Sequence, residues 1–279
     1  AGGKVIASYL KDAQTKLEVY NLKGDYLSDI ELPAIGSAGK FSGDYSESEV
    51  FFSFVSFTFP TTVFVYNTVD GVTKPFFEPK LDFDFSNYET KQVFFTSKDG
   101  TKVPMFIVHK KGLELNGKNA TLLYAYGGFN ANMLPSFSLE RIILLENGGV
   151  FALANIRGGG EYGENWHKAG MGLNKQNVFD DFIAASEYLI NEGYTSPKKL
   201  AIRGGSNGGL LIGAVINQKP DLYAVAFPEV GVMDMLRYHQ FTIGWAWVDE
   251  YGSSKDSVHF ENLYNYSPLH NIKSDLNYP

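Results

Sequence analysis

Four glycines surround one serine in the stretch AIRGGSNGGLLIGA, residues 201–214, and this stretch constrains the fold more than any other. A strand-like apolar segment precedes the glycines, and a helix-like apolar segment follows them. Glycine destabilises regular structure because it loses the most backbone freedom on folding. Its concentration here predicts a sharp strand-to-helix turn, with a backbone conformation closed to other residues and no room for Cβ atoms beside the turn.

The order Gly204-Gly205-Ser206-Asn207-Gly208 satisfies G-x-S-x-G, the nucleophile elbow, in which a turn lifts a serine hydroxyl above the carboxyl edge of a parallel sheet. Glycine-rich junctions also bind phosphates, so a phosphate loop is the alternative. These glycines have neither the G-x-G-x-x-G spacing nor the lysine of a phosphate loop. We therefore rank a nucleophilic Ser206 above a phosphate-binding site.

The composition excludes several classes of protein. With 279 residues, 44% of them apolar, the chain can bury a sizeable core in one or two domains. A net charge of −7 without a basic cluster argues against nucleic-acid and anionic-membrane partners. No apolar stretch is long enough to span a bilayer. The absence of cysteine excludes disulfides, thiol catalysis and cysteine-based metal sites.

Residues 1–82 form the first predicted domain. Short strands separated by turns are expected at 4–10, 16–22, 26–32, 49–57, 62–68 and 72–78. A weak repeat relates 17–21 to 63–67, and the spacing of Tyr20 and Tyr66 is close to the period of roughly 40–45 residues of a propeller blade. A closed propeller takes roughly four to eight blades. This domain is therefore either the end of a larger propeller or a small sheet of another kind.

Residues 83–279 form the second predicted domain, in which strands alternate with helices. This order predicts an α/β fold with a largely parallel sheet. The expected elements are a hairpin at 92–96 and 105–109, strands at 121–126, 149–155 and 223–228, and helices at 177–192 and 207–218. The acidic, amphipathic segment 179–190 is interpreted as a packing helix.

A serine nucleophile needs a histidine base, a carboxylate that orients the histidine, and donors for the oxyanion. The backbone N–H of the residue after the nucleophile supplies one donor, which nominates Asn207. A second donor is expected from YAYGGFN, residues 124–130, either a backbone N–H or the hydroxyl of Tyr126. From the residues alone, a half-buried structural role for Tyr126 is equally favoured.

Five motifs in order resemble the prolyl oligopeptidase family, serine peptidases that cleave short peptides after proline. They are YGGFN, NIRGGGEYGENWHKAG at 155–170, GGSNGG, GVMDM at 231–235 and YSPLHN at 266–271. The resemblance covers the chain from about residue 88 to its end, and the blade-like region also agrees with it. It implies that residues 1–82 are the last blades of a β-propeller and that 83–279 are part of an α/β-hydrolase peptidase domain, with the last strands of the sheet missing.

The resemblance also assigns site residues. It makes Ser206 the nucleophile and gives the oxyanion hole to the Tyr126 hydroxyl and the Asn207 N–H. The proline pocket it implies is formed by Phe129, Val232, Trp247 and Tyr251. An uncharged pocket in which proline stacks on Trp247 suits a flat apolar ring. No cofactor is implied, and no histidine pair has the spacing of a zinc site.

The resemblance places the catalytic Asp and His beyond YSPLHN, outside this chain. His239 lies in MDMLRYHQFTIG, a predicted helical segment, and His259 and His270 are interpreted as surface or structural residues. His109 and His167 precede the nucleophile, against the order of this fold. We therefore expect a second chain or segment to supply both groups, and an isolated incomplete fragment is the alternative.

The expected function is a serine endopeptidase that acts on short proline-containing peptides. A related hydrolase is the nearest alternative: oligopeptidase B, an acylaminoacyl peptidase or a dipeptidyl peptidase. A non-catalytic fragment or interaction module is the alternative from another class. AGGKVIASYL lacks the long apolar region of a secretory signal. We expect a cytoplasmic protein, with a periplasmic or secreted location as the alternative.

Overall fold

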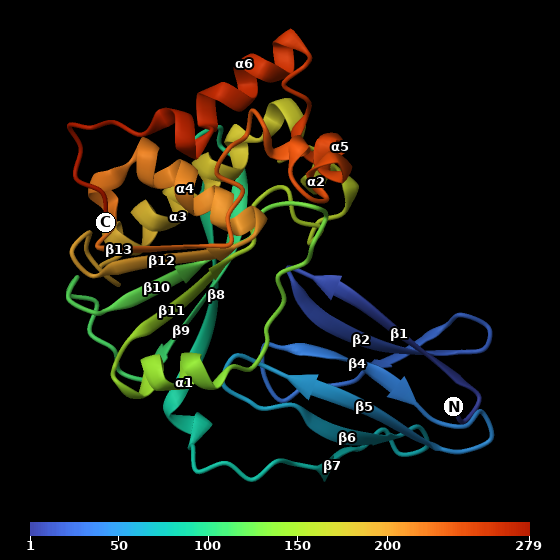
Figure 1. Cartoon of the computed structure of the whole chain (residues 1–279). Coiled ribbons are helices and arrows are strands. Elements are labelled where there is room, and N and C mark those ends of the chain that lie inside the picture. The colour runs from blue at the N-terminus through green and yellow to red at the C-terminus, as the bar shows by residue number, and fades with distance from the viewer. The chain divides into compact units, whose positions relative to one another are not determined.

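The computed structural model describes residues 1–279, and the chain divides into two compact units (Figure 1). Unit 1 contains residues 1–90 and 134–143, and unit 2 contains residues 91–133 and 144–279. In the structure, the first division between the units falls after Thr90. The chain also returns to unit 1 for one segment, which a single boundary does not describe. The boundary between 82 and 83 stays a prediction.

Unit 1 consists of two antiparallel sheets. The first has the order β1-β2-β3 and the second has the order β4-β5-β6-β7. Their strands are β1 (Lys4–Lys11), β2 (Gln14–Asn21), β3 (Tyr26–Asp29), β4 (Ser37–Ser42), β5 (Glu49–Val55), β6 (Thr62–Asn67) and β7 (Thr73–Phe77). A three-residue 3₁₀ turn, η1 (Phe85–Asn87), follows. The sequence analysis missed β4, because SAGKFS has weak strand propensity and forms a strand through its pairing with β5.

The core of unit 1 joins the two sheets. Leu17 and Val19 from the first sheet, with Ile30 just after β3, are buried with Phe52, Phe54, Phe64 and Tyr66 from the second sheet. The sequence repeat does not preserve burial, because Tyr66 is 2% exposed whereas its counterpart Tyr20 is only partly buried. Successive side chains of a strand point to opposite faces. The repeat therefore marks a common strand pattern rather than equivalent core positions.

Unit 2 contains a six-stranded sheet of order β13-β12-β10-β11-β9-β8. β10 pairs in parallel with β11 and β12, β12 pairs in parallel with β13, and β9 pairs antiparallel with β11. The strands are β8 (Tyr88–Thr96), β9 (Lys102–Lys110), β10 (Thr121–Tyr124), β11 (Val150–Ala154), β12 (Leu200–Gly205) and β13 (Val225–Glu229). The expected hairpin and largely parallel sheet are both present.

The helices are α1 (Leu139–Glu146), α2 (Glu164–Lys168), α3 (Gln176–Asn191), α4 (Asn207–Gln218), α5 (Val248–Tyr251) and α6 (Ser257–Tyr266). Short 3₁₀ helices lie at η2 (Gly172–Asn174), η3 (Pro220–Leu222), η4 (Tyr238–Gln240), η5 (Gly244–Trp247) and η6 (Pro268–Asn271). None of the helices combines the length and apolar character needed to cross a membrane.

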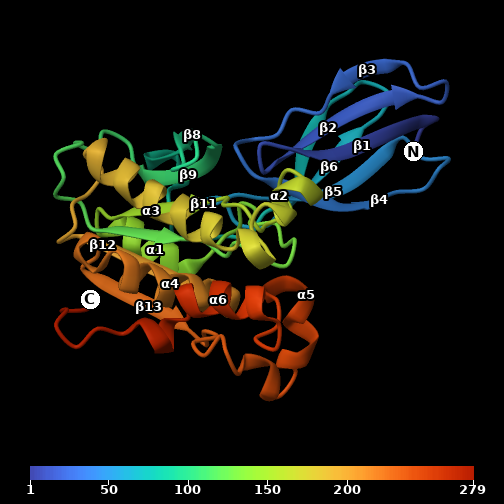
Figure 2. The ribbon, with the colours of Figure 1, turned by 90° about the horizontal axis from the view of Figure 1, so that it is seen from above.

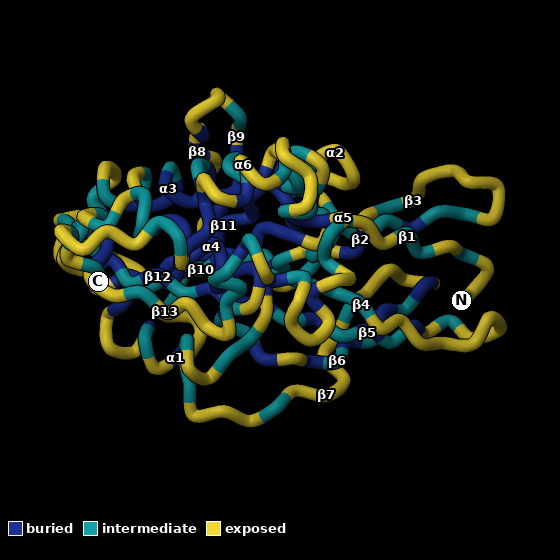
Figure 3. The backbone as a smooth tube through the Cα atoms, turned by 45° about the horizontal axis from the view of Figure 1, so that its top comes forward, coloured by how far each residue is buried: buried dark blue, intermediate teal, exposed yellow.

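Helices α3 and α4 lie side by side on the sheet of unit 2 (Figure 2), and α4 packs on β12 and β13. Both helices are rich in buried apolar residues, among them Phe179, Phe182, Leu210 and Leu211. Figure 3 shows buried residues along α3, α4 and β11. β12 ends at Gly205 and α4 begins at Asn207. The packing of α4 on the sheet therefore fixes the position of Ser206 between them.

The helical prediction around His239 is wrong. Within 233–243, helical structure is limited to the short 3₁₀ turn Tyr238–Gln240, and a second 3₁₀ turn begins at Gly244. Phe241 has an extended backbone, and Thr242 has a φ of 45°. A left-handed conformation at a β-branched residue is incompatible with a continuing helix.

Candidate active site

Ser206 occupies the turn between β12 and α4 with a strained backbone. Its φ is 56° and its ψ is −115°, outside the conformations usual for a residue with a side chain. The Ser206 N–H donates to the Glu229 carbonyl at 2.9 Å, and the N–H groups of Gly209 and Leu210 donate to the Ser206 carbonyl at 2.9 and 3.1 Å. Strain of this kind persists where the surroundings over-determine it. The strand, turn and helix that G-x-S-x-G requires are therefore present.

The glycines beside Ser206 act through space rather than through backbone conformation. None of the four has a positive φ, so the expectation of a backbone closed to other residues is wrong for them; Ser206 itself takes the left-handed angle. The expectation of close approach is confirmed at three. A Cβ atom would come within 2.3 Å of another atom at Gly204, 2.9 Å at Gly208 and 2.5 Å at Gly209, whereas at Gly205 the nearest atom is 3.9 Å away.

A cavity of about 270 Å³ opens beside Ser206. It brings together six of the seven site residues expected from the sequence, although they come from four separate parts of the chain. Its lining residues are Tyr126, Phe129, Ser206, Val232, Trp247 and Tyr251. None of these side chains carries a charge at neutral pH, so the cavity suits a small apolar group.

Tyr126 follows β10 and is hydrogen-bonded through its side chain to Ser206. Burial raises the pKa of Tyr126 above its ordinary value, although the hydrogen bond to Ser206 acts in the opposite direction. The phenol is therefore neutral near pH 7 and can donate a hydrogen bond. Asn207 is the first residue of α4, where backbone N–H groups have no partner within the helix.

The side chain of Asn207 is buried and does not line the cavity. Its Nδ2 donates to the Tyr126 carbonyl at 2.6 Å, and its Oδ1 accepts from the Tyr251 hydroxyl at 3.0 Å. The hydroxyl of Tyr251 is thus turned towards Asn207, while its ring forms part of the cavity wall. Phe129 packs edge-to-face on that ring, with centroids 5.6 Å apart.

A buried ion pair lies behind these residues, and the sequence analysis missed it. The Lys175 Nζ is 3.5 Å from Glu250 Oε1, with the two side chains 1% and 5% exposed. Burial lowers the pKa of Lys175 to about 8, which Glu250 partly opposes. Glu250 directly precedes Tyr251, which the sequence analysis nominated, but nothing in the sequence marks its carboxylate as buried. Lys175 carries no sequence signal at all, because lysine is usually exposed.

A second buried pair holds the loop after β11. The Arg157 Nη2 lies 2.7 Å from Oδ1 of Asp181, and the Arg157 backbone N–H donates to Oδ2 at 3.0 Å. The Asp181 carboxylate is therefore the partner of Arg157, rather than a charge that stabilises the positive N-terminal end of the α3 dipole. The same loop approaches the site, because the Asn130 N–H donates to the Gly158 carbonyl at 3.2 Å.

None of the five histidines lines the cavity at Ser206, and four of them have hydrogen-bond partners elsewhere. His109 Nδ1 lies 2.9 Å from the Lys110 carbonyl, and His167 Nε2 lies 2.7 Å from Glu250 Oε2. His259 accepts from the Ser253 N–H at 3.2 Å, and His270 Nδ1 lies 2.8 Å from the Ser267 hydroxyl. Structural hydrogen bonding, as expected for His259 and His270, is observed.

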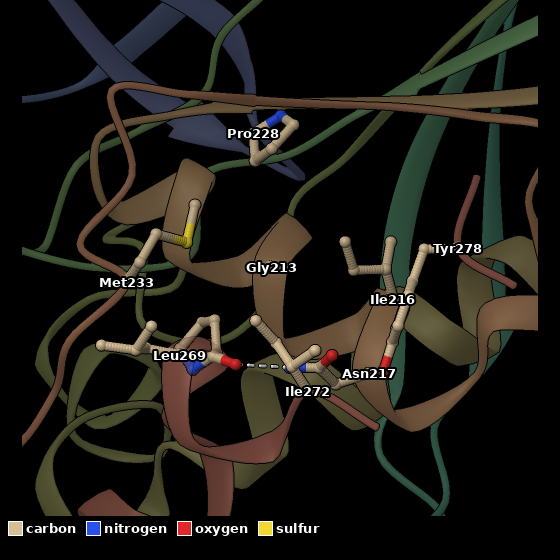
Figure 4. Close-up of a pocket in the computed structure, with 9 residues that line it drawn as sticks. Gly213, Ile216, Asn217, Pro228, Met233, Leu269, Ile272 and Tyr278 are labelled. Carbon is tan, nitrogen blue, oxygen red and sulfur yellow. Dashed lines mark hydrogen bonds between the residues drawn. The ribbon is translucent and has the colours of Figure 1, made fainter. Parts of the chain in front are cut away.

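A larger cavity of about 370 Å³ lies beside α4, and Figure 4 shows its lining. The lining residues are Gly213, Ile216, Asn217, Pro228, Met233, Pro268, Leu269, Ile272 and Tyr278. The Asn217 amide donates to the Pro268 carbonyl at 2.9 Å, so this polar group is already satisfied. No acid or base pair lines this cavity.

Comparison with family models supports two assignments. The model described as "Prolyl oligopeptidase family" matches residues 135–279, and the model described as "Prolyl oligopeptidase, N-terminal beta-propeller domain" matches residues 1–79. The expected fold class, final blades of a propeller followed by part of an α/β-hydrolase domain, is thereby confirmed.

Individual relatives agree with these models. The chain is 50% identical to a prolyl endopeptidase of Elizabethkingia meningoseptica over 279 residues, which are 100% of this chain and 40% of the relative. A structure from a study of two prolyl endopeptidases matches with a TM-score of 0.93 and 45% identity, over 100% of this chain and 41% of that one. A post-proline cleaving enzyme of Rickettsia typhi matches with a TM-score of 0.84 and 35% identity, over 100% and 42%. The chain thus spans about two fifths of the length of these relatives.

Proposed function

This chain belongs to the prolyl oligopeptidase family, and on that premise we propose that it carries the nucleophile, oxyanion donors and proline pocket of a serine endopeptidase that cleaves short peptides after proline. One observation carries the proposal. Ser206 lies on a strained strand-to-helix turn and shares an uncharged cavity with Tyr126 and Trp247. Such a turn exposes a serine hydroxyl, and such a cavity accepts an apolar side chain beside it.

In the proposed reaction, the Ser206 Oγ attacks the carbonyl carbon of the proline residue and its proton passes to a histidine base. The carbonyl oxygen becomes an oxyanion, which accepts hydrogen bonds from the Tyr126 hydroxyl and the Asn207 N–H. Collapse of this intermediate breaks the C–N bond, and the histidine protonates the departing amine. Water then attacks the acyl-enzyme, which releases the peptide acid and restores Ser206.

The cavity also supports the choice of proline. The proline ring has no polar atom to satisfy, and Trp247 and Phe129 offer aromatic surface for it. A lysine or arginine at the same place would bury a charge without a partner, because no lining residue is acidic. This disfavours a basic-specific peptidase such as oligopeptidase B.

We propose that a second chain or a further segment supplies the catalytic Asp and His. The support is that no histidine of these 279 residues lines the cavity and that the relatives are more than twice as long as the matched region. An oxyanion hole without a histidine base would bind a tetrahedral adduct only weakly, and it would not activate Ser206 as a nucleophile.

The test compares hydrolysis of matched Gly-Pro, Gly-Ala and Gly-Arg fluorogenic peptides by the longest natural polypeptide that contains this chain. We expect the Gly-Pro peptide to be hydrolysed much faster than the other two, with this activity lost in Ser206→Ala and accompanied by labelling of Ser206 with a serine-directed phosphonate. The 279-residue chain by itself should be inactive. Serine-dependent cleavage that prefers arginine, or no labelling of the longest polypeptide, would overturn the proposal.

A further inference from the structure

A group of polar side chains, most of them buried, connects the segments that form the candidate active site. It comprises Lys175, Glu250 and His167 with two residues already placed at the site, Asn207 and Tyr251. We call this group the Lys175 network. All members belong to unit 2, although their elements are far apart in the sequence.

The ammonium group of Lys175 contacts both the loop after β10 and the first residue of α4. Its Nζ donates to the Gly127 carbonyl and to Asn207 Oδ1, each at 2.9 Å, and lies 3.5 Å from Glu250 Oε1. These are three partners for three donors. The ring of Tyr251 lies 5.4 Å from the same nitrogen, within cation–π distance. The buried charge is thus fully satisfied by groups of the active site.

Glu250 connects the segment 247–251 to the loop at 126–130. Its Oε1 accepts from the Phe129 N–H at 3.0 Å, and its Oε2 lies 2.7 Å from His167 Nε2. Glu250 also directly precedes Tyr251 and lies three residues after Trp247, both of which line the cavity. The carboxylate therefore connects two walls of the cavity.

The loop at 126–130 needs such support because its backbone is strained. Gly127, Phe129 and Asn130 all have left-handed φ angles, of 66°, 56° and 55°. This region is unfavourable for residues with a Cβ atom and persists where other contacts impose it. The network contacts the loop at the Tyr126 carbonyl, the Gly127 carbonyl and the Phe129 N–H. Three backbone groups of the loop are thus held by the network.

We propose that Lys175 and Glu250 are positioning residues that keep the Tyr126 hydroxyl and the Asn207 N–H aligned on the developing oxyanion. The inference rests on the proposed function. Both donors are carried by segments that Lys175 bridges, the loop after β10 and the first turn of α4. Stability alone does not account for the pair, because replacing a buried ion pair with apolar residues is often neutral or stabilising.

The kinetic test uses Lys175→Met, which keeps the volume of the side chain and removes its charge and donors. In the longest natural polypeptide, we expect kcat on the Gly-Pro peptide to fall roughly 10- to 100-fold with KM changed less than about threefold, because an oxyanion interaction acts in the transition state. Lys168→Met is the matched control, since Lys168 is exposed and pairs with Glu164 at 3.3 Å on the surface.

An inhibitor pair separates positioning from binding. A blocked peptidyl prolinal is attacked by Ser206 Oγ at its aldehyde carbon, and the resulting hemiacetal oxygen occupies the oxyanion hole, whereas the matching prolinol forms no adduct. In Lys175→Met, affinity for the aldehyde should fall at least about tenfold and affinity for the alcohol less than about threefold. An equal loss for both compounds, or unchanged kcat, would overturn the proposal.

Amide hydrogen exchange tests positioning without reference to activity. Residues 126–130 should exchange at least about tenfold faster in Lys175→Met, while the buried strand β9 stays unchanged. Unchanged exchange in this loop overturns the inference even if the wild type cleaves proline peptides. An inactive wild type with faster loop exchange in the variant instead overturns the proposed function alone. If Lys175→Met does not fold, Glu250→Gln is measured instead. This variant removes the charge of Glu250 but keeps an amide oxygen that can accept from the Phe129 N–H.

Discussion

Gly204 and Gly208 approach so closely across the turn at Ser206 that a Cβ atom on Gly204 would lie 2.3 Å from the Gly208 carbonyl oxygen. Gly204→Ala must therefore displace backbone, and we expect a loss of about 1–3 kcal/mol in the free energy of unfolding. Gly205→Ala is the matched control. Its Cβ would find its nearest neighbour 3.9 Å away, so we expect unchanged stability or a gain of up to about 1 kcal/mol. Urea denaturation measures the free energy of unfolding of both variants. Equal losses in the two would contradict the expectation that only Gly204→Ala displaces backbone.

Tyr126→Phe removes the hydroxyl proposed to bind the oxyanion and keeps the ring. We expect kcat on a proline peptide to fall roughly 10²- to 10³-fold with little change in KM, because the lost interaction develops in the transition state. Tyr124→Phe, two residues earlier on β10, is the control and should retain normal turnover. Steady-state kinetics measure both, and an effect confined to KM would assign Tyr126 to substrate binding instead.

Trp247→Ala removes an aromatic wall of the Ser206 cavity. We expect kcat/KM for the Gly-Pro peptide to fall roughly 10- to 100-fold and the preference over Gly-Ala to shrink, because the stacking surface for the ring is lost. Trp245 is 68% exposed and does not line the cavity, so Trp245→Ala should leave both quantities unchanged. An equal loss of kcat/KM for all peptides would show that Trp247 contributes to packing of the site and does not select proline.

Burial raises the pKa of Glu161 above its ordinary value, although hydrogen bonds from the Met133 N–H at 2.8 Å and Asn155 Nδ2 at 3.2 Å oppose this. The folded protein therefore binds this proton more tightly than the unfolded chain does. Its contribution to stability is present below the unfolded pKa and is lost as the pH rises through the folded pKa.

Glu161→Gln keeps an oxygen that can accept both hydrogen bonds and has no proton to lose. We expect the Tm of the variant to rise relative to the wild type as the pH increases from about 4.5 to 8, because only the wild type must bury a carboxylate at the higher pH. Glu161→Ala, which lacks the acceptor, should be destabilised at every pH. Thermal melts across this range test the prediction, and a constant difference between Glu161→Gln and wild type would refute it.

Much of unit 2 follows from short-range patterns. The helix after Ser206 was predicted at 207–218, and α4 has these bounds, because its apolar run begins at a glycine-rich turn and ends before Pro220. The resemblance to the prolyl oligopeptidase family also nominated seven site residues, and the folded chain brings six of them to one cavity. Around His239 the same reasoning failed, because a left-handed residue at Thr242 is not encoded in apolar periodicity. β4 was missed because its pairing with β5, not its composition, makes it a strand.

The sequence by itself determined the order of elements and the serine turn, since each depends on residue type and local spacing. Only the tertiary structure decided that Ser206 rather than a neighbouring glycine takes the left-handed angle, and that Lys175 is buried against Glu250. These two residues are 75 positions apart in the chain, and lysine and glutamate are usually exposed. Their burial depends on how α3 and α5 pack around the loop at 126–130, which no local pattern contains.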